Sequence, residues 1–489
     1  MATHSTNRML SERARAVQPS PTLALTARAQ AMRQQGIDVL SFTAGEPDFD
    51  TPEFAKAGAI TAIHAGYTKY TPTPGIMSLR EAISAKFWRE NQLRYDPSQI
   101  VVSCGAKHSI FNTLMALIDP GDEVIIPTPC WVSYPEQVRL MGGVPVFVPT
   151  DESHDFLPTY DALRAAITPR TKAIILNTPC NPTGAVYPRK TLKEIASLAL
   201  THRLWIIADE IYEKLVYDGH THESIGSLSK EVWNQTITIN GVSKSFAMTG
   251  WRIGYLGAPT EIARAIQALQ DQMTSNPCTV AQYAALAALE DDSDWVEQAR
   301  QRFDARRQRM VEGLSRIPGI CCWRPRGAFY VFANVQALLG RTYNGRLIET
   351  SADLAEYLLE HARVAVVPGE GFCAPGYIRL SYAVHEALIE EGIERIGNAL
   401  AGGVRGCPKN PPSYLTAEAV PMRRSRPASA QPPNPRKQGA IASGGWLCLV
   451  GTALALALSG ASWVPEGIFA TEQVHLSCSK VIFSDTLRA

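Results

Sequence analysis

Short apolar runs alternate with stretches of helical spacing through the first half of the chain, and the runs are rich in Ile and Val. Buried strands of a mostly parallel sheet have this character, because helices cover both faces of such a sheet. We therefore expect strands at residues 100–102, 123–126, 144–148, 172–176, 204–208 and 236–239, with helices over 105–118, 131–141, 158–166 and 190–201. In such a sheet, ligands bind at the carboxyl ends of the strands.

The regions on either side of this pattern predict further helices and a second layer. Before it, we expect helices over 24–35 and 79–91 and a short strand over 38–43. Residues 260–315 have the spacing of long helices, and the many charges of 294–315 predict a mostly solvated or bridging helix. After it, expected strands at 328–333, 363–367 and 377–381 alternate with helices and predict a smaller α/β layer that ends near residue 401.

The character of the chain changes after Gly402. Residues 403–445 are rich in Pro, Ser, Gly and Arg without periodicity, which predicts disorder. Residues 446–464 form an apolar run of about the length that spans a bilayer. Two interpretations stay open: a C-terminal membrane anchor, or a non-functional extension. The second is favoured, because the hydropathy is marginal for a membrane span.

Composition narrows the class of protein. The 489 residues carry a formal net charge of +1, which argues against non-specific nucleic-acid binding. Ten cysteines without a Cys-x-x-Cys pair are expected to be buried in a reducing compartment rather than paired in disulfides. The N-terminal segment has no apolar run of signal-peptide length, so we expect a cytoplasmic protein. His220, His222 and Glu223 lie close together, but no second group of ligands accompanies them, so we expect a polar loop and no metal site.

A lysine in a turn of small residues is the first sign of chemistry. Lys244 follows the expected strand 236–239, and Arg252 comes eight positions later. A lysine so placed can form a Schiff base with an aldehyde cofactor, and an arginine can hold a phosphate bidentately. A short Ser-x-Lys motif also fits an ordinary surface loop, so the prediction depends on the other strand ends.

Those other strand ends supply the remaining parts of a cofactor site. Asp209 ends the run 204–208 and can pair with a pyridinium nitrogen, although a capping role is the simpler alternative. Tyr212 and Asn181 can share the cofactor's phenolic oxygen and favour its ionised form. Gly105, Ala106 and Lys107 open a helix, whose N-terminus favours phosphate.

Two further residues point to ligands. Trp131 can stack on a flat ring, and packing in the core is an equally good interpretation. Arg379 is a charge within the apolar strand 377–381 and needs a partner, which a substrate carboxylate would provide.

Taken in order, these residues resemble the class I aminotransferases of fold type I, which use pyridoxal 5'-phosphate. The resemblance runs from about residue 8 to residue 402. It rests on Gly45, Tyr70, Gly105–Lys107, Trp131, Asn181–Gly184, Asp209–Tyr212, Ser243–Lys244, Gly250–Arg252 and Arg379. Residues 43–49 and 247–255 are similar to the bacterial aspartate aminotransferase branch, which includes aspartate/prephenate aminotransferases.

The resemblance implies a role for each residue on the cofactor side. Lys244 would be the Schiff-base lysine and proton shuttle, Asp209 would pair with the pyridine nitrogen, and Asn181 and Tyr212 would bond the phenolic oxygen. The catalytic residues would then be Lys244, Asp209 and Tyr212. The remaining cofactor contacts would come from Ser243, Arg252, Trp131 and the backbone of Gly105, Ala106 and Lys107, with Tyr70 reaching the partner subunit's phosphate in a homodimer.

On the substrate side, the resemblance implies that Arg379 and Gly45 hold the α-carboxylate, next to Trp131 and Asn181. Lys107 and Thr22 would read the distal carboxylate, with Ser20 as a further candidate. The Asn181–Pro182 peptide is expected to be cis.

The family fold implies a large domain over 46–290 with a mostly parallel seven-stranded sheet. A small α/β domain over 291–402 would be joined by residues 1–45, and the family lacks the tail 403–489. The implied activity is transamination between aspartate or glutamate and a 2-oxo acid, with prephenate as a candidate substrate. Two alternatives stay open: an aminotransferase for alanine, aromatic or kynurenine-type substrates, and a non-catalytic cofactor-binding regulator. Such regulators usually carry a DNA-binding module, but no helix-turn-helix candidate with a basic face precedes residue 20.

Overall fold

The computed structural model describes residues 10–17, 21–401 and 404–405. The apolar run 446–464 and nearly all of the predicted disordered tail therefore lie outside the described residues. The chain divides into two units, 1–411 and 412–489, and every described residue belongs to the first. None of the helices within the described ranges is long and apolar enough to cross a bilayer.

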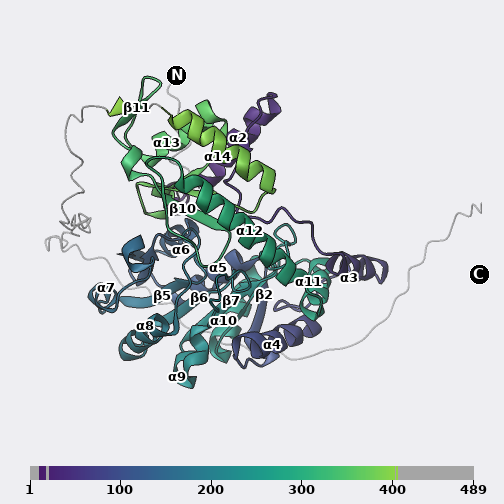
Figure 1. Cartoon of the computed structure of the whole chain (residues 1–489). Helices are drawn as coiled ribbons and strands as arrows, with labels where there is room; N and C mark the ends of the chain where they lie inside the picture. Colours follow the sequence, from purple (N-terminus) through teal and green to yellow (C-terminus); the bar gives the residue numbers. More distant parts are fainter. Residues whose placement is uncertain (1–9, 18–20, 402–403, 406–489) are drawn as a thin grey trace, which may run out of the picture. The chain divides into compact units, whose positions relative to one another are not determined.

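A seven-stranded sheet is the largest element of the fold (Figure 1). Its strands run in the order β2 (Ile100–Ser103), β8 (Gly254–Gly257), β7 (Thr236–Gly241), β6 (Trp205–Asp209), β5 (Thr171–Asn177), β3 (Glu123–Thr128) and β4 (Val144–Pro149). β8 is antiparallel to both of its neighbours, and the other strands are parallel. The six strands predicted from the apolar runs are confirmed. β8 was missed, because four residues that begin and end with glycine make a weak strand signal.

Both faces of this sheet are buried. Along β5, Ala173 and Ile175 belong to one hydrophobic cluster, whereas Ile174 and Leu176 belong to another. The first cluster includes residues of α5 (Ala106–Leu117), α6 (Ser133–Leu140) and α10 (Thr260–Met273). The second includes residues of α7 (Tyr160–Ala166), α8 (Arg189–His202) and α9 (Lys230–Trp233). These apolar faces leave the ends of the strands as the place where charged side chains can gather.

A third cluster lies beside β2, where α4 (Met77–Asn91) packs with α3 (Glu53–His64) and α11 (Thr279–Glu290). Leu79, Ile83 and Phe87 of α4 have no exposed surface, which confirms the helix predicted from their spacing. The helix predicted over 24–35 is α2 (Pro21–Gln34), which begins earlier, at a proline. Proline suits the first turn of a helix, because the N–H that it lacks has no partner there.

Smaller sheets form the second layer. A four-stranded antiparallel sheet has the order β14 (Val367–Pro368), β15 (Tyr377–Ser381), β10 (Tyr330–Asn334) and β9 (Cys321–Cys322). β1 (Leu40–Ser41) pairs in parallel with β13 (Val364–Ala365), and β11 (Arg341–Tyr343) lies between β12 (Arg346–Ile348) and β16 (Val404–Arg405). The single strand predicted over 363–367 is therefore two strands in different sheets. The β1–β13 pair joins the N-terminal segment to the C-terminal third, whereas the domain limits at 45, 290 and 402 stay predictions.

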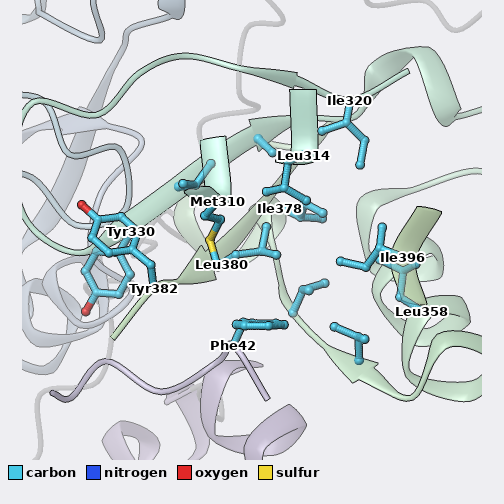
Figure 2. Packing of buried hydrophobic residues seen from close by; sticks show 14 of the residues in the cluster. Phe42, Met310, Leu314, Ile320, Tyr330, Leu358, Ile378, Leu380, Tyr382 and Ile396 are labelled. Atoms are coloured by element: carbon cyan, nitrogen blue, oxygen red, sulfur yellow. The ribbon is translucent and has the colours of Figure 1, made fainter. Parts of the chain in front are cut away.

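The core of this second layer corrects one prediction (Figure 2). Three more helices belong here, α12 (Trp295–Ser315), α13 (Ser351–Tyr357) and α14 (Glu386–Leu400), whereas α1 (Glu12–Ala16) precedes α2 in the chain. Phe303, Met310 and Leu314 of α12 are each at most 1% exposed and pack in the cluster, so of the two expectations, a mostly solvated or a bridging helix, the first is wrong. The many charges of α12 hid a narrow apolar stripe. Arg307 of this helix is also fully buried, where it pairs with Asp218 and Asp304.

Candidate active site

The sheet brings distant parts of the sequence to one edge. Asp209 is the last residue of β6, and Lys244 comes three residues after β7 ends. Trp131 and Asn181 follow the ends of β3 and β5. Arg252 precedes β8, and because β8 is antiparallel, its start lies at the same edge as the carboxyl ends of the other strands.

A cavity of about 310 Å³ opens at this edge. The predicted site residues that line it are Gly45, Ala106, Lys107, Trp131, Asn181, Asp209, Tyr212, Ser243, Lys244, Arg252 and Arg379. Gly105 adjoins the cavity through its neighbour Ala106. Tyr70 does not line the cavity and is 92% exposed. Thr22 lies in the first turn of α2, but its side chain is outside what the structure describes, as is Ser20 altogether.

Lys244 reaches into the cavity from the turn after β7. Its Nζ donates a hydrogen bond to the carbonyl oxygen of Gly45 at 2.5 Å. Burial lowers the pKa of Lys244 to about 8; Glu46 opposes this shift, and Arg252 adds to it. A Cβ atom at Gly45 would lie 2.7 Å from the hydroxyl of Tyr330, so a larger residue at this position would have to displace that buried side chain. An amine with this pKa is partly neutral near physiological pH and can act as a base or a nucleophile.

Asp209 is a buried carboxyl group. The hydroxyl of Tyr134 donates to Asp209 Oδ2 at 2.6 Å, and the backbone N–H of Ile211 donates to Oδ1 at 3.3 Å. Burial raises the pKa of Asp209 to about 6, although both hydrogen bonds favour the ionised form. A cationic ring placed against this carboxylate would offset the cost of its burial.

Arg379 enters the cavity from the middle of β15, where it lies opposite Phe332 of β10. Its Nη1 donates to Asn181 Oδ1 at 2.9 Å and its Nη2 to the carbonyl oxygen of Thr43 at 2.7 Å. The guanidinium also lies 4.4 Å from the ring centre of Tyr330. Its Nε is buried and has no hydrogen-bond partner among the described residues. Arg379 therefore joins the smaller sheet to the turn after β5 and retains a donor for an anion.

The turn after β5 holds its polar groups firmly. The side chain of Asn177 accepts a hydrogen bond from the backbone N–H of Asn181 at 2.8 Å. The Asn181–Pro182 peptide is cis, which confirms the prediction. Tyr212 belongs to consecutive turns after β6, and its hydroxyl lies 2.8 Å from that of Tyr330. Burial raises the pKa of Tyr212 well above its usual value, so the hydroxyl stays a hydrogen-bond donor.

Positive charge gathers at the start of α5. Gly105 has a φ of 87°, and a Cβ atom there would lie 2.4 Å from Arg252 Nη2. The glycine therefore allows the guanidinium to approach the first turn of the helix. Lys107 lies within the same turn, and burial together with Arg252 lowers its pKa. Its Nζ is 4.8 Å from the ring centre of Trp131. Two cations beside a helix N-terminus suit an anionic ligand.

Comparisons with known proteins agree with this geometry. Residues 37–396 match the family model described as aminotransferase class I and II. The chain belongs to this family. It is 48% identical to a probable aspartate/prephenate aminotransferase of Aquifex aeolicus (strain VF5), over 80% of this chain and 98% of that protein. It is also 48% identical to an aspartate aminotransferase of Bacillus sp. (strain YM-2), over 79% of this chain and 98% of that protein. The structure of Thermus thermophilus aspartate aminotransferase with maleate superimposes with a TM-score of 0.76 at 46% identity, covering 80% of this chain and 99% of that one.

Three residues of the aminotransferase site were missed by sequence reasoning. Tyr134 bonds Asp209, Tyr330 bonds Tyr212, and Asn177 fixes the backbone of Asn181. Tyr134 comes three residues after Trp131 in an expected helix, so the spacing could have indicated a shared face. Tyr330 lies in an apolar strand and is indistinguishable there from a core residue.

The aminotransferase also has a buried polar cluster beside the site. His222 Nε2 lies 3.1 Å from Glu210 Oε2, and Glu213 is close enough to both for the three to hold a metal ion. The expectation that no second group of ligands accompanies His222 is therefore wrong, because folding brings it to the turn after Asp209. The ammonium of Lys86 contacts Glu213 Oε1, and Asn91 Nδ2 donates to its Oε2 at 2.6 Å. The side-chain ammonium group of Lys86 thus already supplies positive charge to this cluster of Glu210, Glu213 and His222.

The cysteines of the aminotransferase differ in part from the prediction. The seven described cysteines are free thiols, as expected. Cys130 and Cys180 are buried, but Cys278, Cys321 and Cys373 are exposed, so the expectation of buried thiols is wrong for these three.

Proposed function

We propose that this aminotransferase moves an amino group between aspartate or glutamate and a 2-oxo acid, with pyridoxal 5'-phosphate as its cofactor. The observation that carries the proposal is one cavity lined by Lys244, Asp209, Arg252 and Arg379. An amine, a carboxyl group and two guanidinium groups are the functional groups that this chemistry needs. Prephenate is a candidate substrate, because relatives carry aspartate/prephenate names.

The residues present fit this cofactor. Arg252 and the first turn of α5 suit a phosphate, because Gly105 leaves room for the guanidinium beside the helix N-terminus. Asp209, buried and with a raised pKa, suits a protonated ring nitrogen. In this proposal Ser243 would be a further phosphate ligand, Trp131 would stack on the ring, and Asn181 and Tyr212 would bond the phenolic oxygen. When bound, the cofactor supplies an electron sink for the substrate α-carbon.

The side chains of this protein then divide the work. The Lys244 amine would hold the cofactor in the resting enzyme. Once the amino acid has replaced it there, the free amine would take the substrate α-proton and later return that proton to complete the amino-group transfer. Its lowered pKa keeps a neutral fraction available for this task. The carboxylate of Asp209 keeps the ring nitrogen protonated, and Tyr134 holds that carboxylate in place through a hydrogen bond of 2.6 Å.

We propose that two separate groups recognise the dicarboxylate substrate. Arg379, with Gly45, Trp131 and Asn181 around it, takes the α-carboxylate, for which its buried Nε is an open donor. Lys107 takes the distal carboxylate, with Thr22 as a further contact. The structure of the Thermus thermophilus relative with maleate, itself a dicarboxylate, supports this substrate class.

Assembly and location belong to the same proposal. Tyr70 is 92% exposed and lies apart from the cavity of its own chain, which fits a residue that reaches the phosphate in a partner subunit of a homodimer. A cytoplasmic location fits the seven described free thiols.

A panel of amino donors tests the substrate class. In single-turnover half-reactions, we expect aspartate and glutamate to react with a higher kcat/KM than alanine, phenylalanine or kynurenine. Replacing Lys107 with Ala should raise KM for aspartate about 10–100-fold, because one charge-assisted hydrogen bond is lost. The KM for alanine should change far less.

The control is Lys172→Ala, which removes an exposed lysine at the start of β5. If Lys107→Ala weakened aspartate and alanine equally, Lys107 would not read the distal carboxylate. A wild-type preference for aromatic or kynurenine-type donors would favour the other aminotransferase activities. A protein that binds the cofactor but turns over no donor would be a regulator.

A further inference from the structure

Two cysteines from distant parts of the sequence meet beside the cavity. Cys130 directly precedes Trp131, in the segment after β3. Cys373 directly follows the 3₁₀ helix Gly369–Phe372, which lies between β14 and β15. The backbone N–H of Cys130 donates to the carbonyl oxygen of Phe372 at 3.1 Å. The two chain segments are therefore in direct backbone contact where the thiols lie.

The two thiols also influence each other. A side-chain hydrogen bond between them is the largest influence on the pKa of each. Cys130 is only 3% exposed, whereas Cys373 is exposed. One of the two residues is thus open to solvent, and the other is enclosed by the fold.

The environment makes the exposed thiol the more acidic of the two. The hydrogen bond from Cys130 lowers the pKa of Cys373, and the nearby Arg139 adds to this effect. The same hydrogen bond, together with burial, raises the pKa of Cys130. The thiolate is the reactive form of cysteine, and accessible thiols of low pKa next to a second cysteine are typical of redox-sensitive sites.

We propose that Cys130 and Cys373 form a redox-sensitive dithiol site, which hydrogen peroxide converts to a disulfide. The thiolate of Cys373 attacks one peroxide oxygen and breaks the O–O bond, which gives a sulfenic acid and a hydroxide that is protonated to water. The sulfur of Cys130 then attacks the sulfur of Cys373 and breaks its S–O bond. The hydroxide released takes the proton of Cys130, so two thiols are oxidised and one peroxide is reduced to two waters.

This bond would join the two halves of the substrate site. Cys130 directly precedes Trp131 in the chain, and Trp131 lines the cavity on the side of the large sheet. Cys373 follows Phe372, whose ring centre lies 5.0 Å from the guanidinium carbon of Arg379. A disulfide would therefore tie the Trp131 segment to the support of Arg379 and restrict any movement between them during substrate entry and release.

Mass spectrometry of the cofactor-loaded full chain tests the bond itself. Cleavage after Lys and Arg releases Cys130 in peptide 108–139 and Cys373 in peptide 364–379, and each peptide contains one cysteine. After peroxide treatment without reductant, we expect these two peptides to appear joined, with a mass about 2 Da below their sum. Dithiothreitol should separate them. The bond should be absent in Cys373→Ser and in Cys130→Ala, and retained in the control Cys321→Ser, which alters an exposed thiol of β9.

Turnover provides the second measurement. We expect peroxide to remove more than half of the wild-type turnover and dithiothreitol to restore it, whereas Cys373→Ser should resist. Three results would overturn the proposal: no joined peptides, a bond from Cys130 to the neighbouring Cys180 instead, or a 130–373 disulfide that leaves turnover unchanged. The peptide measurement needs no substrate, so it is independent of the choice of amino donor.

Discussion

At the scale of single residues, the site contains groups whose ionisation costs stability. Asp209 is the clearest example, because burial raises its pKa to about 6. The favourable contribution of its protonated form is fully present below about pH 4 and is lost as the pH rises through 6. In the cofactor-free protein at neutral pH, the buried carboxylate therefore lowers the free energy of unfolding by something on the order of 3 kcal/mol.

Replacing Asp209 with Asn should remove this cost. We expect the cofactor-free variant to be more stable than the wild type at pH 7.5, and the difference to shrink towards pH 4.5. Urea denaturation of both proteins at the two pH values measures this. The control is Asp292→Asn, which alters an exposed carboxylate. A stability difference that does not depend on pH would contradict the argument.

Lys244 carries the second prediction at this scale. The variant Lys244→Ala should bind the cofactor without covalent attachment and lose turnover by roughly 10³-fold or more, because both the nucleophile and the proton carrier are removed. Borohydride reduction followed by peptide mass spectrometry should find the cofactor on the Lys244 peptide of the wild type and on no peptide of the variant. Lys230→Ala, at an exposed position, is the control. Full turnover in Lys244→Ala would end the proposed chemistry.

At the scale of elements, α12 shows how a narrow apolar stripe can anchor a helix whose other residues are largely charged. Phe303 lies on this stripe, with its ring centre 5.0 Å from that of Phe49 and 5.4 Å from that of Phe329. The variant Phe303→Ala would leave a cavity among these rings, so we expect it to lower the free energy of unfolding by about 3–5 kcal/mol. Gln308→Ala, on the exposed face of the same helix, should change it by less than about 0.5 kcal/mol. Equal effects in urea denaturation would mean that the stripe does not hold the helix.

At the scale of the whole molecule, the proposed homodimer makes a prediction about shared sites. If Tyr70 acts in the partner subunit, a Tyr70→Phe chain and a Lys244→Ala chain complement each other. One site of the mixed dimer then combines an intact Lys244 with an intact Tyr70. Co-refolding equal amounts should recover up to about a quarter of wild-type activity, because half of the dimers are mixed and half of their sites are complete.

The control for this experiment is each variant refolded alone. Activity in the mixture that merely equals the sum of the two separate preparations would place Tyr70 in its own subunit's site, or would exclude a shared site.

The sequence by itself determined the parts that depend on local pattern. Apolar runs with intervening helical spacing predicted six of the seven strands, because burial on both faces leaves a continuous signal. Strand ends then indicated where Lys244 and Asp209 would lie, because ligands bind at the carboxyl edge of a parallel sheet. Known family motifs added the candidates that local pattern alone left ambiguous, such as Trp131.

Only the tertiary structure decided the contacts between residues that are far apart in the chain. No local pattern shows that Tyr134 would bond Asp209, that Lys86 would enter the cluster of Glu210, or that Cys373 would meet Cys130. Such pairings depend on how helices and strands pack, and the side chain of a buried tyrosine or cysteine is compatible with many neighbours. Local pattern thus defines the elements, whereas burial and long-range packing set the pKa values and the partners of the groups between them.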